Sequence, residues 1–230
     1  MKLQLAIANK NYSSWSMRPW VLLRAAGIAF EELQFWFDEN DKLPKEIFTV
    51  SPTGKVPCLV IDGESVWESL AICETLAELF PDKALWPRDA AARRFARVIA
   101  TEMHAGFTAL RSTLPMNIKV KIDGRKMTKP DVERDLARVS AIWHQARAEF
   151  GELATGAEAG PYLFGRYTIA DAMYAPVVMR LITGGFTLSP VAQAYREAAA
   201  QHPAVLEWIA HAKVETGSEP GVDRYYAALA

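Results

Sequence analysis

The sequence predicts two structural parts, an α/β part followed by an all-helical part. Strand and helix patterns alternate as far as Phe80, a segment bounded by Pro81 and Pro87 interrupts them, and only helical patterns follow. A chain of 230 residues is long enough for two small domains. We therefore predict domains at 1–82 and 89–230, joined by a linker at 83–88.

The first strand and the first helix are separated by a serine-rich stretch. The apolar run Leu3–Ala8 predicts the strand. Val21–Ala26 predicts a helix that stops at Gly27, because glycine is common just after a helix. Asn11–Trp20 lies between them and contains three serines. If Ser16 is the helix cap, Pro19 falls in the first helical turn, where a missing N–H costs nothing.

The rest of the first part predicts a second βα unit and then a hairpin with a helix. Asp62-Gly63 marks the hairpin, since this dipeptide favours a two-residue turn. The order is βαβ, then αββα, so the first half is a parallel unit with a crossover helix. The remaining predicted elements are strands at 30–37, 56–61 and 65–67, a short helix or turn at 43–50, and a helix at 69–80.

The second part predicts helices throughout. A small-residue loop at 151–160 separates two of them, and the tail at 215–230 could pack back over the first domain. The predicted helices span 89–114, 130–150, 168–182, 191–200 and 203–214.

Composition argues against several functional classes. A net charge of −1 gives no reason to expect a nucleic acid or an anionic membrane as partner. No stretch approaches the roughly 20 apolar residues of a membrane span, and the N-terminus resembles no signal peptide, so we expect a cytoplasmic protein. Cys58 and Cys73 fit a reducing compartment. Neither the cysteines nor the four histidines have the spacing of a metal site, so we expect no metal.

Two local features carry chemistry. Free N–H groups and the helix dipole favour an anion where Ser13, Ser14 and Ser16 lie, and a serine hydroxyl there can either cap the helix or donate to that anion. Pro57 opens a strand, so either this strand lies at an edge or the Val56–Pro57 bond is unusual, for example cis.

Four motifs together resemble one family. They are Ser13–Arg18, Gly54–Leu59, Glu68–Ile72 and the capping box Thr168–Asp171. In this order and spacing they resemble the soluble glutathione transferases over essentially the whole chain, in particular bacterial, serine-type members with a zeta-like or theta-like motif. The resemblance implies a thioredoxin-like N-terminal domain, an all-helical C-terminal domain and glutathione as co-substrate. It also implies a detoxifying enzyme that is a homodimer, with the helices from Asp89 and Ser69 at the interface.

The resemblance also assigns residues for thiol activation. The catalytic group of the family lies five residues before the arginine that is Arg18 here, which gives Ser13. Ser14 and Ser16 are the alternatives, as second donors or as caps. The serine would stabilise the thiolate of glutathione, whose free thiol has a pKa of about 8.5.

Further positions of the resemblance would hold the rest of glutathione. The Val56 backbone, turned by a cis Pro57, would pair with the cysteinyl backbone. Ser69 would bind the γ-glutamyl carboxylate and Glu68 the ammonium group. Lys42, or Lys45, would meet the glycyl carboxylate.

The electrophile is expected between the domains. Trp15, Met103, His104 and Phe107 are the candidates, together with residues of the tail. A structural alternative exists for each: Met103 and Phe107 fit a hydrophobic core equally well, and a lone helical histidine is more often structural.

At several positions this sequence differs from the motifs of particular classes of the family, and these differences limit the reactions that the resemblance implies. Ile7 stands where a tyrosine-type site needs tyrosine, and Ser13 stands where a cysteine-type site needs cysteine. Trp15 and Trp20 replace a cysteine and a second arginine of the zeta pattern, which weighs against isomerase activity. Three functions follow in order of preference: a transferase that conjugates glutathione to a small electrophile, a glutathione-dependent isomerase of the maleylacetoacetate type, and a non-catalytic glutathione-binding protein.

Overall fold

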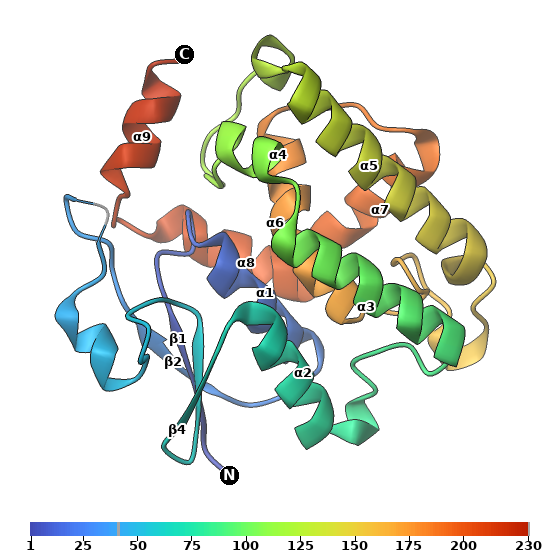
Figure 1. The fold of residues 1–230 in the computed structure, drawn as a ribbon, viewed down its shortest axis with the longest axis horizontal. Helices are drawn as coiled ribbons and strands as arrows, with labels where there is room; N and C mark the ends of the chain where they lie inside the picture. Colours follow the sequence, from blue (N-terminus) through green and yellow to red (C-terminus); the bar gives the residue numbers. More distant parts are fainter. Residues whose placement is uncertain (41, 230) are drawn as a thin grey trace.

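A four-stranded sheet forms the centre of the first part of the chain in the computed structural model, which describes residues 1–40 and 42–229 (Figure 1). The strand order is β2-β1-β3-β4, with β1 parallel to β2 and antiparallel to β3, and β3 antiparallel to β4. The strands are β1 (Leu3–Ile7), β2 (Glu31–Gln34), β3 (Cys58–Ile61) and β4 (Glu64–Trp67). The helices of this part are α1 (Ser14–Ala25) and α2 (Ser69–Leu79), with short 3-10 turns at Lys45–Thr49 and Pro81–Lys83.

The predicted order of elements is therefore confirmed. The hairpin turn also lies where Asp62-Gly63 predicts it, with positive φ angles of 49° and 99° at the two residues. The second strand is shorter than the predicted 30–37, since pairing with β1 extends only over Glu31–Gln34.

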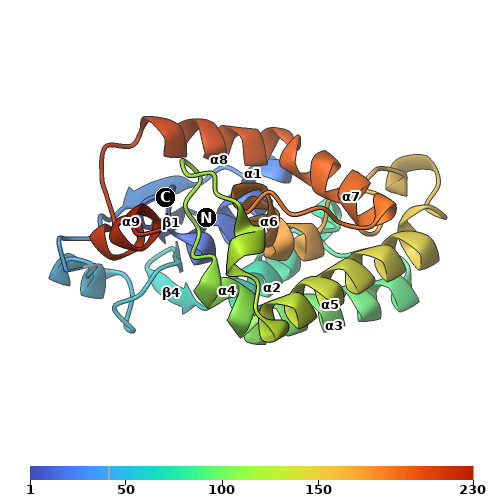
Figure 2. The same cartoon turned by 90° about the horizontal axis from the view of Figure 1, so that it is seen from above.

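Helices make up most of the rest of the chain (Figure 1). Seen from above, α6 lies between a layer of α7 and α8 and a layer of α3 and α5 (Figure 2). The helices are α3 (Ala90–Ala105), α4 (Thr108–Thr113), α5 (Pro130–Ala146), α6 (Ile169–Thr183), α7 (Pro190–Ala200), α8 (Pro203–Val214) and α9 (Pro220–Ala227). Short 3-10 turns lie at Gly124–Met127 and Gly156–Glu158, and a π-helical turn follows α5 at Arg147–Gly151. None of the helices in the described ranges is long and apolar enough to cross a membrane.

The first helix begins seven residues earlier than predicted. Ser13 is its N-cap residue, so the hypothesis that Ser16 caps it is wrong, and Pro19 lies inside the helix rather than in its first turn. Serine favours the cap position, and a cap at Ser13 places Met17 and Trp20 on the buried side of the helix. The serine-rich stretch is therefore the helix start itself.

The helix predicted over 89–114 is two helices. α3 ends at Ala105, and Phe107 has a left-handed conformation with φ of 55° before α4 begins. Gly106 allows the break, because a Cβ at this position would stand 2.7 Å from the carbonyl oxygen of Glu102. The break turns α4 away from α3.

The tail does pack back onto the first part, as expected. The Glu215 carboxylate accepts the backbone N–H groups of Lys10 and Asn11 at 2.8 and 3.1 Å. From α9, Asp223 accepts the Tyr12 hydroxyl at 2.9 Å.

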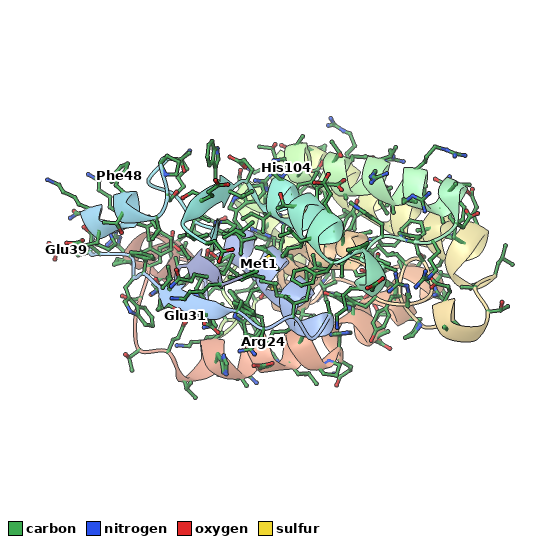
Figure 3. The ribbon with its side chains drawn as sticks, turned by 90° about the horizontal axis from the view of Figure 1, so that it is seen from below. Met1, Arg24, Glu31, Glu39, Phe48 and His104 are labelled. Atoms are coloured by element: carbon green, nitrogen blue, oxygen red, sulfur yellow. The ribbon has the colours of Figure 1, made fainter. Side chains whose placement is uncertain are left out.

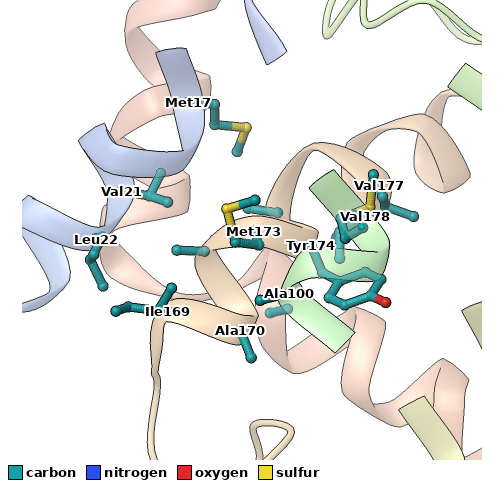
Figure 4. Packing of buried hydrophobic residues seen from close by; sticks show 14 of the residues in the cluster. Met17, Val21, Leu22, Ala100, Ile169, Ala170, Met173, Tyr174, Val177 and Val178 are labelled. Carbon is teal, nitrogen blue, oxygen red and sulfur yellow. The ribbon is translucent and has the colours of Figure 1, made fainter. Parts of the chain in front are cut away.

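One hydrophobic core runs through both parts of the chain. Met17, Val21 and Leu22 of α1 face Ile169 and Met173 of α6 (Figure 4). The Arg18 Nε donates to the Met173 carbonyl at 3.1 Å, inside the same contact. The serine end of α1 is thus fixed against the helical part. The division at 83–88 stays a prediction.

Candidate active site

A hollow of about 220 Å³ lies where the third strand begins, and we call it the cis-proline hollow. The Val56–Pro57 bond is cis, as the resemblance implies. β3 starts at the next residue and lies between β1 and β4, so the edge-strand alternative for Pro57 is wrong. The lining residues are Trp15, Thr53, Lys55, Val56, Pro57, Trp67, Glu68 and Ser69.

Ser69 lines this hollow with a hydroxyl that has nothing to bind. Its side chain belongs to a residue that is 1% exposed, and the hydroxyl has no hydrogen-bond partner within residues 1–40 and 42–229. Glu68 occupies the N-cap of α2, and Ser69 is the first residue of the helix. The first N–H groups of α2 lack intrahelical partners, and the helix dipole favours negative charge there. A buried unpaired hydroxyl at a helix start suits an anionic ligand.

Glu68 stands at the mouth of the hollow, with its side chain 61% exposed. The His104 Nε2 lies 3.7 Å from its carboxylate. Burial and the charge of Arg18 lower the pKa of His104, so the imidazole is neutral at pH 7. His104 therefore does not neutralise the Glu68 carboxylate, which is available to pair with another cation.

The serines adjoin a second hollow of about 260 Å³, the serine hollow. Ser13 and Ser14 line it, and it shares Trp15, Lys55 and Val56 with the cis-proline hollow. Tyr12, Phe37, Leu43 and Glu219 complete its lining. The two hollows therefore form one continuous surface from Ser69 to Ser13.

The three serines have different surroundings. The Ser13 hydroxyl donates to the Ser16 hydroxyl at 2.7 Å, and Ser16 accepts the Ala8 N–H at 3.3 Å. Ser16 is fully buried and lines none of the described hollows, so it holds Ser13 in place rather than facing a ligand. The Ser14 hydroxyl has no hydrogen bond to any described residue and lines two hollows.

Tyr12, directly before the serines in the sequence, also lines the site. Its hydroxyl donates to both oxygens of Asp223 at 2.9 Å. Burial, with a smaller contribution from Asp223, raises the pKa of Tyr12 to about 12. Its proton is thus held by the tail, and a tyrosine-type site is disfavoured.

Lys55, and not the candidate Lys42, is the lysine that lines the described hollows. Lys42 is exposed, its backbone N–H donates to the Asp38 carboxylate, and it lines none of the described hollows. Lys55 lines two of them. Its place directly before Val56 in the motif is the signal that could have found it.

The electrophile candidates separate into two groups. Met103 and Phe107 are in the hydrophobic core, 0% and 6% exposed. Trp15 lines the cis-proline hollow, the serine hollow and a third hollow that is described below. His104 contacts Trp15 edge-on, with 5.3 Å between the ring centres. His104 comes from α3 and lies beside α2 (Figure 3). It therefore supports the wall that Trp15 forms.

A third hollow, of about 300 Å³, opens on the other side of Trp15. Sequence reasoning missed it because its residues come from α1, α4, α6 and α9. Its lining is Tyr12, Ser14, Trp15, Thr108, Arg111, Ser112, Pro115, Met116, Arg180, Glu219 and Val222. Within the described part of the chain, no group of His, Cys, Asp and Glu side chains is arranged to hold a metal ion.

Fold and site together define a thioredoxin-like domain, with a buried unpartnered hydroxyl at a helix start, followed by an all-helical domain. Residues 12–79 match the family model described as glutathione S-transferase, N-terminal domain. A probable glutathione transferase from Aplysia californica is 31% identical over 84 residues, 36% of this chain and 88% of that protein. The chain belongs to the glutathione S-transferase family.

Other relatives differ from one another in the activity that their names state. A probable maleylacetoacetate isomerase from Caenorhabditis elegans is 28% identical over 180 residues, 77% of this chain and 78% of that protein. A crystal structure of a glutathione transferase homologue from Burkholderia with bound glutathione is 22% identical, covers 94% of this chain and 100% of its own, and has a TM-score of 0.66. The predicted fold class is confirmed.

Proposed function

We propose that this protein binds glutathione and activates its thiol as a thiolate for conjugation to a small electrophile. The buried, unpartnered Ser69 hydroxyl, beside a cis proline in a hollow that continues to the serines, carries the proposal. The Burkholderia homologue, which shares the fold, contains bound glutathione.

Each end of glutathione has a matching group. Ser69 and the first N–H groups of α2 bind the γ-glutamyl carboxylate, and Glu68 pairs with the ammonium group. The Val56 backbone has no hydrogen bond to another described residue and pairs with the cysteinyl backbone. Lys55, in place of the expected Lys42, meets the glycyl carboxylate, because it lines both hollows.

Ser13 is the proposed donor to the thiolate. It lies at the N-cap of α1, where the helix dipole also favours negative charge. To donate to sulfur, its hydroxyl turns away from Ser16. Lowering the thiol pKa by about 2 units requires about 2.7 kcal/mol, which one or two charge-assisted hydrogen bonds and the helix end can supply. The thiolate then forms a sulfur–carbon bond while the leaving group departs, and the thiol proton passes to solvent.

An isomerase is the second candidate, because a relative from Caenorhabditis elegans has that probable activity. In that case glutathione adds to the substrate and is released unchanged. Stoichiometric consumption of glutathione separates the two, since only conjugation uses one glutathione for each product.

The proposal includes a homodimer that acts in the cytoplasm. Leu79 on α2 and Val98 on α3 support the dimer, because these apolar side chains are 38% and 56% exposed on the helices expected at the interface.

A thiolate difference titration tests the proposal. Glutathione is titrated with base on the wild type and on Ser13→Ala, Ser14→Ala and Ser16→Ala, and ultraviolet absorbance reports the thiolate. We expect the wild type to ionise glutathione at about pH 6.5, and Ser13→Ala alone to return the pKa of the bound thiol towards about 8.5.

Three outcomes decide the assignment. Loss in Ser14→Ala alone would transfer the donor role to Ser14. Binding without ionisation would favour the non-catalytic glutathione-binding protein. A wild type that does not bind glutathione at all would contradict the proposed function.

A further inference from the structure

The third hollow carries an unusual concentration of positive charge, and we call it the arginine hollow. Arg111 of α4 and Arg180 of α6 line it. Arg18 lies behind its Trp15 wall, with the guanidinium carbon 3.9 Å from the centre of the indole ring. The guanidinium carbon of Arg111 is 4.7 Å from the same ring. Two guanidinium groups thus flank the Trp15 wall of this hollow, and a third, that of Arg180, belongs to its lining.

The hydrogen bonds of these arginines go to backbone carbonyls. Glu219 aside, no carboxylate within residues 1–40 and 42–229 forms an ion pair with any of the three. Arg180 donates to the carbonyls of Leu114 and Pro176, and Arg111 donates to the carbonyl of Gly106. Carbonyl oxygens satisfy donors but leave the positive charge uncompensated.

The lack of a compensating negative charge is most costly for Arg18. It is fully buried, and neither terminal nitrogen of its guanidinium has a hydrogen-bond partner in the described part of the chain. Burial, and then the charges of Arg180 and Arg111, lower the pKa of Arg18. Burial and Arg111 likewise lower the pKa of Arg180 to about 10, so it stays charged at pH 7. Buried charges are normally paired, and an anion in the hollow would supply the missing charge.

The rest of the lining suits a small anion joined to a reactive carbon. Thr108 and Ser112 add hydroxyl donors from the same helix as Arg111. Glu219 is the one acidic residue in this lining, at the side formed by the tail. Ser14 and Trp15 line both this hollow and the serine hollow, so a ligand held by Arg111 has its other end next to the proposed position of sulfur.

We propose that the arginine hollow binds a carboxylate, and hence that the electrophiles of this enzyme are small molecules that carry a carboxylate group. Arg111 and Arg180 hold the two oxygens, since a guanidinium matches a carboxylate with paired N–H donors. The assignment of the ligand as the electrophile rests on the proposed function, whereas the carboxylate site itself does not.

A binding experiment without glutathione tests the carboxylate site alone. Isothermal titration compares 3,5-dinitrobenzoate with neutral 1,3-dinitrobenzene on the wild type, Arg111→Gln, Arg111→Lys and Arg134→Gln. Arg134 is an exposed arginine on α5 and serves as the matched control. We expect the wild type to bind the carboxylate at least about tenfold more tightly than the neutral compound, and Arg111→Gln to lose most of that preference. Arg111→Lys should keep part of it, and Arg134→Gln should keep all of it.

Several results would overturn the carboxylate site. They are equal binding of the two compounds by the wild type, equal loss in Arg134→Gln, and displacement of dinitrobenzoate by inorganic phosphate at the same concentration as by a carboxylate such as benzoate. The comparison within the wild type requires no variant, so a variant that fails to fold leaves the test intact.

A turnover experiment then tests the link to catalysis. With glutathione present, kcat/KM is compared for 4-chloro-3,5-dinitrobenzoate and 1-chloro-2,4-dinitrobenzene, each divided by its rate without enzyme. In both reactions a sulfur–carbon bond forms and chloride leaves. We expect the corrected ratio to favour the carboxylate by at least about tenfold and to fall in Arg111→Gln. Carboxylate binding without any binding of glutathione would contradict the proposed function and leave the anion site standing, whereas turnover with no preference would contradict the substrate class alone.

Discussion

At the scale of single residues, the candidate site is distinguished by a buried polar group that has no hydrogen-bond partner among the described residues. A buried hydroxyl without a partner normally costs free energy, and the Ser69 hydroxyl is such a group, which supports its proposed role in ligand binding. Ser65, four residues earlier, shows the contrast, because its hydroxyl donates to the Val50 carbonyl at 2.7 Å. The Ser65 hydroxyl is therefore used within the fold, whereas that of Ser69 is left for the ligand that we propose.

Ser69→Ala should weaken glutathione binding by about 10-fold to 100-fold, the value of one hydrogen bond to a charged group of about 1.5–3 kcal/mol. Its free energy of unfolding should stay the same or rise slightly, because a buried unpaired group is removed. Titration calorimetry and urea unfolding measure the two quantities. Ser65→Ala is the control and should show the reverse, lower stability with unchanged affinity. A loss of stability in Ser69→Ala would indicate a structural serine.

Much of the glutathione side of the site could be predicted at this scale. Val56, Pro57, Glu68 and Ser69 lie in two short motifs, and the fold brings these motifs to one hollow. The arginine hollow could not be predicted, since Arg18, Arg111 and Arg180 lie on three helices whose packing no local pattern specifies. Glu68 takes an unusual backbone conformation, with φ of 67° at a non-glycine residue, and the sequence gives no sign of it.

At the scale of elements, the start of α6 is the best-defined helix end. Asp171 is 1% exposed and accepts the Thr168 N–H at 2.8 Å, the Thr168 hydroxyl at 2.9 Å and the Leu163 N–H at 3.0 Å. The predicted capping box is present, and the additional bond to Leu163 ties the preceding loop to the helix. The carboxylate therefore serves three buried donors rather than one helix end.

Asp171→Ala should lower the free energy of unfolding by about 2–4 kcal/mol, more than the 1–2 kcal/mol typical of a lost cap, because three buried donors lose their acceptor. Urea unfolding followed by circular dichroism measures the change. Asp89→Ala is the matched control, since Asp89 caps the exposed start of α3 with one bond to the Ala92 N–H at 2.8 Å. A loss of the same size in both variants would show that Asp171 is an ordinary cap.

Most helices could be predicted from apolar spacing, whereas two boundaries could not. The pattern from Asp89 to Leu114 continues through the break, and Phe107 combines a left-handed backbone with a ring that packs in the core. The early start of α1 was hidden by Pro19, which suggests a first turn and instead lies in the helix interior.

At the scale of the whole molecule, one core joins both parts, and each part has an exposed apolar side chain on the surface that α2 and α3 form. Arg97 of α3 contacts Glu74 of α2 at 3.2 Å, so the two helices expected at the dimer interface form one continuous surface. Leu79 and Val98 are exposed on it. The order of domains could be predicted from the change in periodicity, but a partner surface could not, because an exposed apolar residue has no pattern of its own.

Light scattering should give twice the chain mass of 25.6 kDa for the wild type. The double variant Leu79→Glu/Val98→Glu should be a monomer, because buried unpaired carboxylates at an interface are costly. Leu206→Glu, at an exposed leucine of α8 that is 43% exposed, is the control and should stay a dimer. A wild-type protein with the mass of one chain would contradict the homodimer.

The attachment of the tail affects how the protein should be handled. Glu215 and Asp223 anchor the tail to Lys10, Asn11 and Tyr12, and Val222 lines the arginine hollow. A purification tag fused after α9 would pull on the segment that borders the arginine hollow. Met1 is exposed and stands at the other end of the sheet (Figure 1), so an affinity tag or an immobilisation linker belongs there.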